Sequence, residues 1–133
     1  MNYILDACAM LAYLKGEPGA LVVDSLLGNS TEVCYAHSIN LCEVYYDFLR
    51  HSEERIAQQA LSDLYADGVI ERQDMNRHFW HTVGQHKARG GISLADCFCI
   101  ALAQYLQGEV VTSDHREFDP LIPLGLCPIN FIR

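Results

Sequence analysis

The sequence is short of positive charge and has no long apolar run. Nine Lys and Arg residues stand against 17 Asp and Glu, a formal net charge of −8. This surplus counts against a broad nucleic-acid-binding surface, so a polyanion would need metal ions, a local basic patch or a basic partner. No apolar stretch approaches the roughly 20 residues that span a bilayer, and the N-terminus lacks the features of a signal peptide. We therefore expect a cytoplasmic protein without a membrane partner.

Paired metal-ligand cysteines and glycine-rich nucleotide motifs are also absent. The six cysteines lie in apolar stretches without CxxC spacing, so we expect buried, reduced thiols and neither disulfides nor zinc. No GxGxxG follows a predicted strand, which excludes a Rossmann enzyme. With 133 residues, half of them hydrophobic, the sequence predicts one domain over residues 1–133.

Short apolar runs alternate with segments of helical periodicity. The predicted strands are 2–5, 31–35, 109–112 and 129–132, with 69–70 as a minor edge strand. The predicted helices are 7–14, 18–27, 38–50, 52–65, 74–89 and 97–106, with Ser38 and Ser52 as N-caps and Asp74 as the start of the fifth. Strands separated by helices require right-handed crossovers. The pattern therefore predicts an α/β fold with a central, mostly parallel sheet covered on both faces.

Four acidic residues lie at the ends of predicted elements. Asp6 and Asp114 end apolar strands, while Glu43 and Asp96 are expected in the first turns of two helices. Since ligand sites in parallel sheets lie beyond the carboxyl ends of the strands, all four can converge at one edge. Carboxylates gathered without cations repel one another, so the cluster implies a bound metal. All-oxygen ligands favour Mg²⁺ or Mn²⁺, and two such ions roughly 3.5–4 Å apart can support phosphoryl transfer.

Each acid also has an ordinary structural explanation. Asp6 suits the N-cap of the following helix, and Asp96 completes a capping box that begins at Ser93. A glutamate near a helix start, such as Glu43, suits the helix dipole, and Asp114 suits a turn. Helix capping and turns alone do not explain why all four acids are expected at the same edge of the sheet. The joint pattern therefore favours the metal site.

The segments around these acids match a known family in order and spacing. They are Leu5–Leu14 with the following Lys15–Gly19, Ser38–Val44, Ser93–Asp96, and Val111–Asp114 with Phe118. Together they resemble the PIN-domain proteins, especially the VapC-like toxins of bacterial toxin–antitoxin pairs. The likeness covers nearly the whole chain. No single motif is specific to this family, but four motifs in the family's order and spacing are a strong match.

The resemblance implies a three-layer α/β/α sandwich and a metal-dependent endoribonuclease. Asp6, Glu43, Asp96 and Asp114 would be the catalytic residues and would hold one or two Mg²⁺ or Mn²⁺ ions. The expected reaction is in-line hydrolysis of an RNA phosphodiester, which leaves a 5′-phosphate and a 3′-hydroxyl. The resemblance further implies a homodimer and a cognate antitoxin whose basic side chain enters the acidic site.

One residue departs from the resemblance and three others are secondary candidates. Cys8 occupies a position where the family commonly has a Ser or Thr hydroxyl, and a thiol is a weaker donor, which puts support of the site there in doubt. Thr112 and Ser113 either contact a phosphate, orient Asp114 or satisfy the strand end. Arg116 is a candidate phosphate contact because it lies beside the fourth acid.

The helix before Asp96 carries basic and histidine residues. Lys87 and Arg89 either touch the RNA backbone or form a solvated helix end. His78 and His81 are three residues apart but have no acid at a metal-ligand spacing. We expect both, together with His86, on a solvent-facing helix.

Two other functions compete with the nuclease. A PIN-like module that binds RNA or a protein without cutting is suggested by Cys8 and the charge of −8, and RNA binding that survives metal removal would favour it. A phosphatase fits poorly because Asp6-Ala7-Cys8 lacks the second aspartate of a DxD motif.

Overall fold

A computed structural model describes residues 1–133 as five strands and seven α-helices. The strands are β1 (Asn2–Leu5), β2 (Val33–His37), β3 (Ile70–Arg72), β4 (Glu109–Thr112) and β5 (Ile129–Phe131). The helices are α1 (Ala7–Lys15), α2 (Ala20–Leu27), α3 (Ser38–His51), α4 (Glu54–Ala66), α5 (Arg77–Arg89), α6 (Leu94–Leu106) and α7 (His115–Phe118), with a 3-10 helix, η1 (Asp119–Leu124). The order of elements follows the sequence-based prediction.

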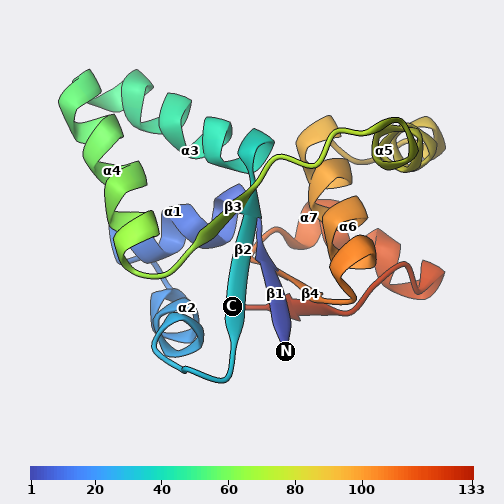
Figure 1. Ribbon diagram of the computed structural model, residues 1–133, viewed down its shortest axis with the longest axis horizontal. Coiled ribbons are helices and arrows are strands. Elements are labelled where there is room, and N and C mark those ends of the chain that lie inside the picture. The colour runs from blue at the N-terminus through green and yellow to red at the C-terminus, as the bar shows by residue number, and fades with distance from the viewer.

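The strands form one sheet in the order β3-β2-β1-β4-β5, and every neighbouring pair is parallel. Figure 1 shows this sheet nearly edge-on between two groups of helices, with α1 to α4 on one side and α5 to α7 on the other. The predicted three-layer α/β/α sandwich is confirmed. Because the strands are parallel, their carboxyl ends share one edge, and the two central strands, β1 and β4, bring Asp6 and Asp114 to it.

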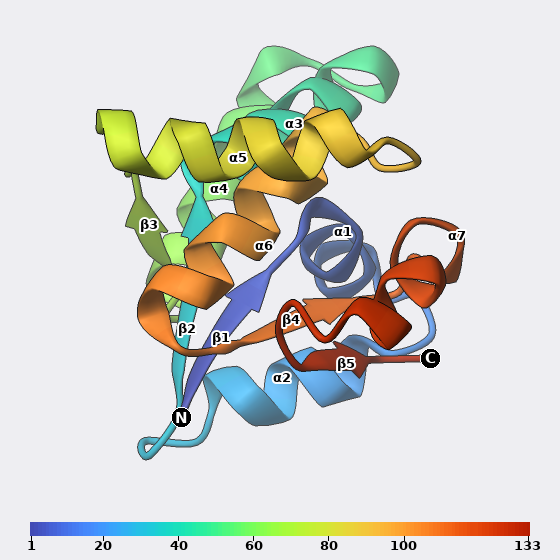
Figure 2. The same ribbon diagram turned by 90° about the vertical axis from the view of Figure 1, so that its right-hand side faces the viewer.

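Alternating side chains of the central strands divide the core into two halves. Ile4 and Val110 belong to the cluster under α5 and α6, whereas Leu5 and Val111 belong to the cluster under α1 to α4. Successive strand residues point to opposite faces, so each short strand contributes to both halves. Figure 2 shows α6 in front of the sheet with α5 crossing it. α6 is buried along most of its length, as its apolar sequence predicts.

Several predicted helix starts are wrong. The N-cap of α3 is His37, whose Nδ1 accepts from the Ile39 N–H at 3.1 Å, while the Ser38 hydroxyl donates to Glu71. Ser52 ends α3 in extended conformation, and α4 begins after Glu53. A serine whose hydroxyl has a tertiary partner is not free to cap the helix.

The starts of α2 and α5 also differ from the prediction. α2 begins at Ala20 rather than Pro18, because Gly19 takes a left-handed backbone conformation (φ 97°) and forms the N-cap. α5 begins at Arg77, where the Asn76 side chain accepts from the Phe79 N–H at 2.9 Å. Asp74 instead pairs with Arg72 of β3, whose Nε lies 2.8 Å from the Asp74 Oδ1.

The remaining differences concern the segment after β4 and the burial of the thiols. α7 and η1 were not predicted, since a four-residue helix and a proline-containing turn carry too few residues for a periodic signal. All six cysteines are free, as expected, but only Cys34, Cys97 and Cys99 are buried. Cys8 and Cys127 are half-buried and Cys42 is exposed. None of the helices has the length and apolar character needed to cross a membrane.

Candidate metal-binding site

Asp6 is held in place at the end of β1. It is 1% exposed, and its Oδ1 accepts from the Ala9 N–H at 2.8 Å, which caps α1. Its Oδ2 accepts a hydrogen bond from the hydroxyl of Thr112 on the neighbouring strand β4. Asp6 is therefore both the helix cap that its sequence position allows and a member of the acidic rim. The two interpretations do not exclude each other.

Asp114 follows the end of β4 and caps α7. Its backbone N–H donates to the Thr112 hydroxyl oxygen at 2.9 Å, and its Oδ1 accepts from the Glu117 N–H at 3.0 Å. The Thr112 hydroxyl thus joins Asp6 to the Asp114 backbone. This single side chain sets the relative position of the acids from the two central strands.

Asp96 is the third residue of α6 and is 8% exposed. Its backbone N–H donates to the Oγ of Ser93 at 3.2 Å, so the predicted N-cap is confirmed. The Ser93 N–H in turn donates to the Oε2 of Glu117 at 3.1 Å. α7 is thereby tied to the start of α6, which brings its carboxylates next to Asp96.

Glu43 lies in the second turn of α3, not the first, because it is the sixth residue of a helix that begins at Ser38. Its Oε1 accepts from the Nδ2 of Asn40 at 3.2 Å, and the same Nδ2 donates to the Ala95 carbonyl at 3.2 Å. Asn40 is fully buried, and its Oδ1 has no partner. The amide therefore ties Glu43 to the residue before Asp96.

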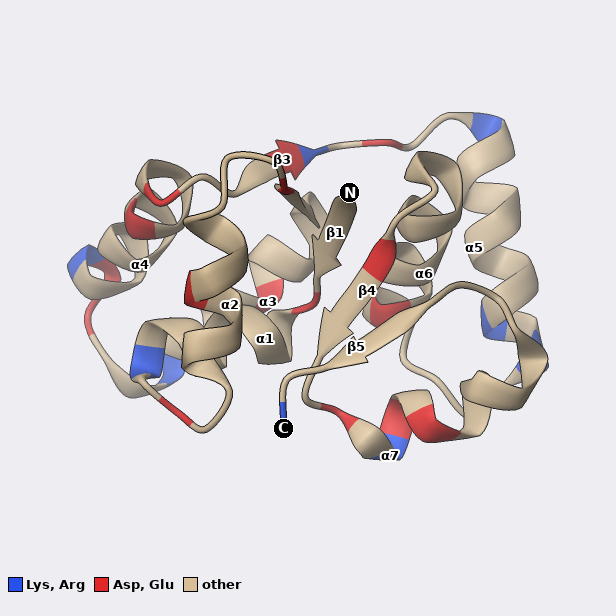
Figure 3. Ribbon diagram, turned by 90° about the horizontal axis from the view of Figure 1, so that it is seen from below, with Lys and Arg blue, Asp and Glu red and all other residues tan.

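The structure brings three carboxylates into direct metal-ligand range of one another. Asp96, Asp114 and Glu117 each offer one oxygen, and these atoms lie within 4.8 Å of one another. Figure 3 shows acidic segments on α3, α6 and α7 and at the end of β1 facing the same region. Glu117 was missed by the sequence analysis. The signal for it was its place three residues after Asp114, one turn away if a helix starts there.

Burial and mutual repulsion oppose ionisation of these acids. Burial, together with the negative charges of Asp114 and Glu43, raises the pKa of Asp6 to about 7, although its two hydrogen bonds act in the opposite direction. Burial and the charge of Asp6 raise the pKa of Asp96 to about 8, and burial also raises the pKa of Glu43. None of the ion pairs in the structure involves these residues or Glu117.

The donor set fits a hard divalent cation. The groups are carboxylate oxygens without a cationic side chain, which is the ligand chemistry that Mg²⁺ and Mn²⁺ prefer. Bound positive charge would favour the ionised form of every acid whose pKa burial raises. No histidine or cysteine belongs to the cluster, so its chemistry does not favour zinc.

The secondary candidates have different surroundings. Thr112 is completely buried, and its hydroxyl donates to Asp6 and accepts from the Asp114 N–H. It therefore orients the acids and is not available to a phosphate. Ser113 is half-buried, and Arg116 on α7 is exposed without an ion pair. Cys8 is half-buried, and burial followed by the charge of Asp6 raises its thiol pKa to about 12.

The basic and histidine residues of α5 lie outside the cluster. Lys87 Nζ donates to the Ile92 carbonyl at 2.8 Å in the loop before α6, and Arg89 is exposed. His78 and His81 are exposed, as predicted. His86 is not: it is buried against α6, with a ring nitrogen 2.9 Å from the Gln104 Oε1, because its helix position faces the core.

Solved structures with the same fold were identified by comparison. DNA-bound VapBC from Salmonella typhimurium has a TM-score of 0.74 and 18% identity, covering 100% of this chain and 99% of that one. VapBC-1 from nontypeable Haemophilus influenzae has a TM-score of 0.71 and 18% identity, covering 99% and 98%. The sarcin-ricin-loop-cleaving toxin VapC20 of Mycobacterium tuberculosis has a TM-score of 0.64 and 15% identity, covering 85% and 90%. At these identities the likeness shows the fold.

The chain is thus a parallel α/β/α sandwich with a cluster of acidic side chains at the carboxyl ends of its central strands. The family model described as the PIN domain matches residues 3–120. The chain belongs to the PIN-domain family, as the sequence motifs predicted. No curated protein matches the chain by sequence.

Proposed function

We propose that this protein is a Mg²⁺- or Mn²⁺-dependent endoribonuclease. The observation that carries the proposal is the group of Asp96, Asp114 and Glu117, buried or half-buried carboxylates within metal-ligand range of one another. Asp6 and Glu43 lie near enough for their charges to raise the pKa of Asp96, and no cationic side chain pairs with any of the five. Asp6, Glu43, Asp96 and Asp114 are the proposed catalytic and metal-binding residues, and Glu117 joins them. PIN-family membership supports this assignment.

The chain's own residues arrange the acids before any ligand arrives. Thr112 fixes Asp6 against Asp114, Asn40 fixes Glu43 against the start of α6, and Glu117 holds Ser93. When bound, a divalent cation would supply an activated water and offset charge on the phosphodiester. Preorganised ligands avoid the cost of rearranging repelling carboxylates during the reaction.

RNA is the substrate class that the comparisons favour. VapC20, described as cleaving the sarcin-ricin loop, has the same fold. Several similar structures are VapBC complexes or toxin–antitoxin complexes, which supports an antitoxin partner and a toxin role for this chain. A basic side chain from such a partner would neutralise the site. We also propose a homodimer, one domain over residues 1–133, and a cytoplasmic location, which suits six free thiols.

The test is cleavage of a long structured RNA by the purified protein with Mn²⁺ or Mg²⁺. An Asp96→Asn variant provides the comparison, because it removes one charge while the Ser93 cap, which uses the backbone N–H, remains. We expect metal-dependent cleavage by the wild type and loss of cleavage in the variant at equal folded fraction. If Mn²⁺ neither stabilises the wild type nor supports cleavage, the metal site is wrong and a binding module without catalysis takes its place.

A further inference from the structure

The face of α3 that carries Glu43 continues with an aromatic residue and a cation. Tyr46 follows Glu43 by three residues and Arg50 follows Tyr46 by four, so the three side chains share one face of the helix. At a rise of 1.5 Å per residue, Tyr46 lies about 4.5 Å and Arg50 about 10.5 Å along the axis from Glu43. The line leads directly away from the acidic cluster.

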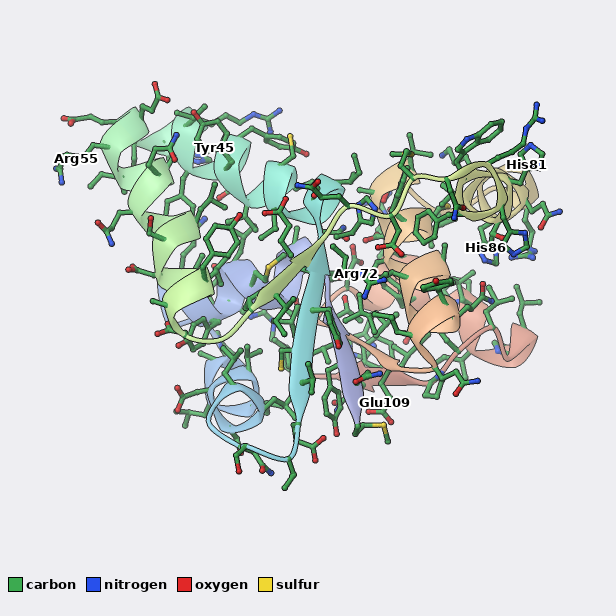
Figure 4. The ribbon with its side chains drawn as sticks, in the orientation of Figure 1. Tyr45, Arg55, Arg72, His81, His86 and Glu109 are labelled. Carbon is green, nitrogen blue, oxygen red and sulfur yellow. The ribbon has the colours of Figure 1, made fainter.

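Tyr46 is the uncovered member of a tyrosine pair. Its neighbour Tyr45 donates its hydroxyl to the Oε1 of Glu54 at 2.9 Å, and Figure 4 shows Tyr45 between α3 and α4. Tyr46 forms no such bond and is 41% exposed. Its ring is therefore open to a partner outside the chain.

Arg50 lies beside the Tyr46 ring and has no acidic partner. Its guanidinium carbon is 4.9 Å from the ring centroid. By contrast, Lys15 pairs with Asp47, and Arg72 pairs with an acid of its own. Arg116 and several other basic residues also lack an ion pair. Among the cations that lie over an aromatic ring, however, only Arg50 has no acidic partner, and its position on the helix of the proposed catalytic Glu43 leaves it available to a phosphate.

We propose that Tyr46 and Arg50 form a subsite for an unpaired nucleotide of the RNA next to the scissile phosphate. The base stacks on the Tyr46 ring, and the Arg50 guanidinium contacts the neighbouring phosphate. This proposal rests on the proposed ribonuclease function. Aromatic rings with an adjacent arginine are common platforms for single-stranded RNA, because every base has a π face.

The subsite has a consequence for the choice of substrate. A base in a continuous duplex is stacked on its neighbours and cannot lie on Tyr46 without leaving the helix, which costs a few kcal/mol. The protein is therefore expected to bind unpaired segments and loops in preference to duplex of the same sequence. Selectivity by stacking discriminates paired from unpaired RNA more than one base from another.

The experiment measures binding of a short unpaired, fluorescently labelled RNA by anisotropy in EDTA, with cleavage measured separately in Mn²⁺. Tyr46→Leu removes the π face, Tyr46→Phe keeps it, and Arg50→Ala removes the cation. Trp80→Leu is the matched control, because Trp80 on α5 has a similar exposure of 44% and no cation beside it.

We expect Tyr46→Leu to weaken RNA binding by about tenfold, with Tyr46→Phe and Trp80→Leu close to the wild type. Arg50→Ala should reduce the slope of log affinity against log salt by about 0.7, the value for one single-strand phosphate. Equal binding of the duplex, or a Tyr46→Leu variant that binds like the wild type, overturns the subsite while wild-type cleavage still supports the proposed function.

Two further outcomes overturn the subsite in distinguishable ways. If the wild type neither binds nor cuts RNA, the proposed function fails together with the subsite, and the failure is visible without any variant. If Tyr46→Leu changes the oligomeric state in size-exclusion chromatography and leaves monomer binding unchanged, the patch is a contact between copies of the chain.

Discussion

Two groups of carboxylates lie toward the same end of the β-sheet, and the chain treats them in opposite ways. On the β3 side, Glu71 accepts hydrogen bonds from Ser38, Tyr65 and Gln73. Asp74 accepts from both Nε and Nη2 of Arg72, at 2.8 and 3.0 Å. These bonds hold the pKa of Glu71 and of Asp74 below their usual values. Figure 4 places Arg72 between the sheet and α6.

On the side of β1 and β4 the acids lack such partners and their pKa values shift in the opposite direction. Asp6 and Asp96 are more buried than Glu71 and Asp74, yet no cationic side chain pairs with them, and their pKa values are raised rather than lowered. Leaving like charges buried together costs free energy that the β3 side avoids. The fold can therefore satisfy acids at this edge with its own side chains, and it does so only where the proposed chemistry is absent.

The largest effect is expected when one acid on each side of the sheet edge is replaced by its amide. Asp114→Asn keeps an oxygen that can cap α7 but removes a proposed ligand. We expect it to lower the RNA-cleavage rate by about 100-fold or more, since even groups outside the ligand set are worth about 10- to 100-fold. Mn²⁺ titration by calorimetry should show weaker binding. Initial cleavage rates in Mn²⁺ provide the second readout.

Asp74→Asn is the matched control. It disrupts the pair with Arg72, so we expect a loss of about 1 kcal/mol in the free energy of unfolding. Cleavage and Mn²⁺ affinity should remain near the wild-type values. If Asp74→Asn reduced cleavage as much as Asp114→Asn at equal folded fraction, the division of the rim into a structural and a functional side would be wrong.

The fold was largely predictable because its signals are local and repeated. Apolar runs, helical spacing and glycine stops identify all five strands and six of the seven α-helices, and the crossover rule makes the sheet parallel. Helix starts were less predictable. The Ser38 hydroxyl donates to the distant Glu71 and the Asp74 carboxylate accepts from the nearby Arg72, and a single sequence does not show which partner competes with a cap.

Four acids of the candidate site, Asp6, Glu43, Asp96 and Asp114, could be picked out from the sequence. Glu117 depends on a four-residue helix with no periodic signal, and Asn40 depends on α3 lying beside the start of α6. Thr112 was considered for a phosphate as well as for orienting Asp114, and only burial decides between these roles. Residues that act through contacts between distant elements are those that spacing along the chain does not reveal.

The raised pKa values on the β1 and β4 side also predict how stability depends on pH. In the metal-free protein the pKa values of Asp6 and Asp96 are raised to about 7 and about 8. Between pH 4 and these values the folded state binds more protons than the unfolded state, so the free energy of unfolding falls as pH rises. We expect the protein in EDTA to be roughly 1–4 kcal/mol less stable at pH 8 than at pH 5. Urea unfolding at each pH measures this difference.

Saturating Mn²⁺ should reverse the trend, because the cation binds ionised carboxylates and stabilises the folded state by mass action. The Asp96→Asn variant in EDTA should lose part of the pH dependence, since the acid whose pKa is raised to about 8 no longer titrates. A metal-free wild type that becomes steadily more stable from pH 5 to pH 8 would contradict the raised pKa values.

The smallest expected effect concerns Cys8, whose thiol replaces the hydroxyl expected from the family resemblance. In this structure the Asp6 carboxylate already accepts a hydroxyl bond from Thr112 and an N–H bond from Ala9. Cys8→Ser should therefore change the melting temperature little, corresponding to about 0.5 kcal/mol or less, and should leave cleavage within about threefold.

Thr112→Val is the comparison: it leaves a buried carboxylate oxygen and the Asp114 N–H without their partner, at a cost of about 1–3 kcal/mol. Differential scanning calorimetry and cleavage rates of the two variants decide between the supports. A large gain in activity from Cys8→Ser would mean that Thr112 does not replace the missing hydroxyl and that the site of this chain is incomplete as it stands.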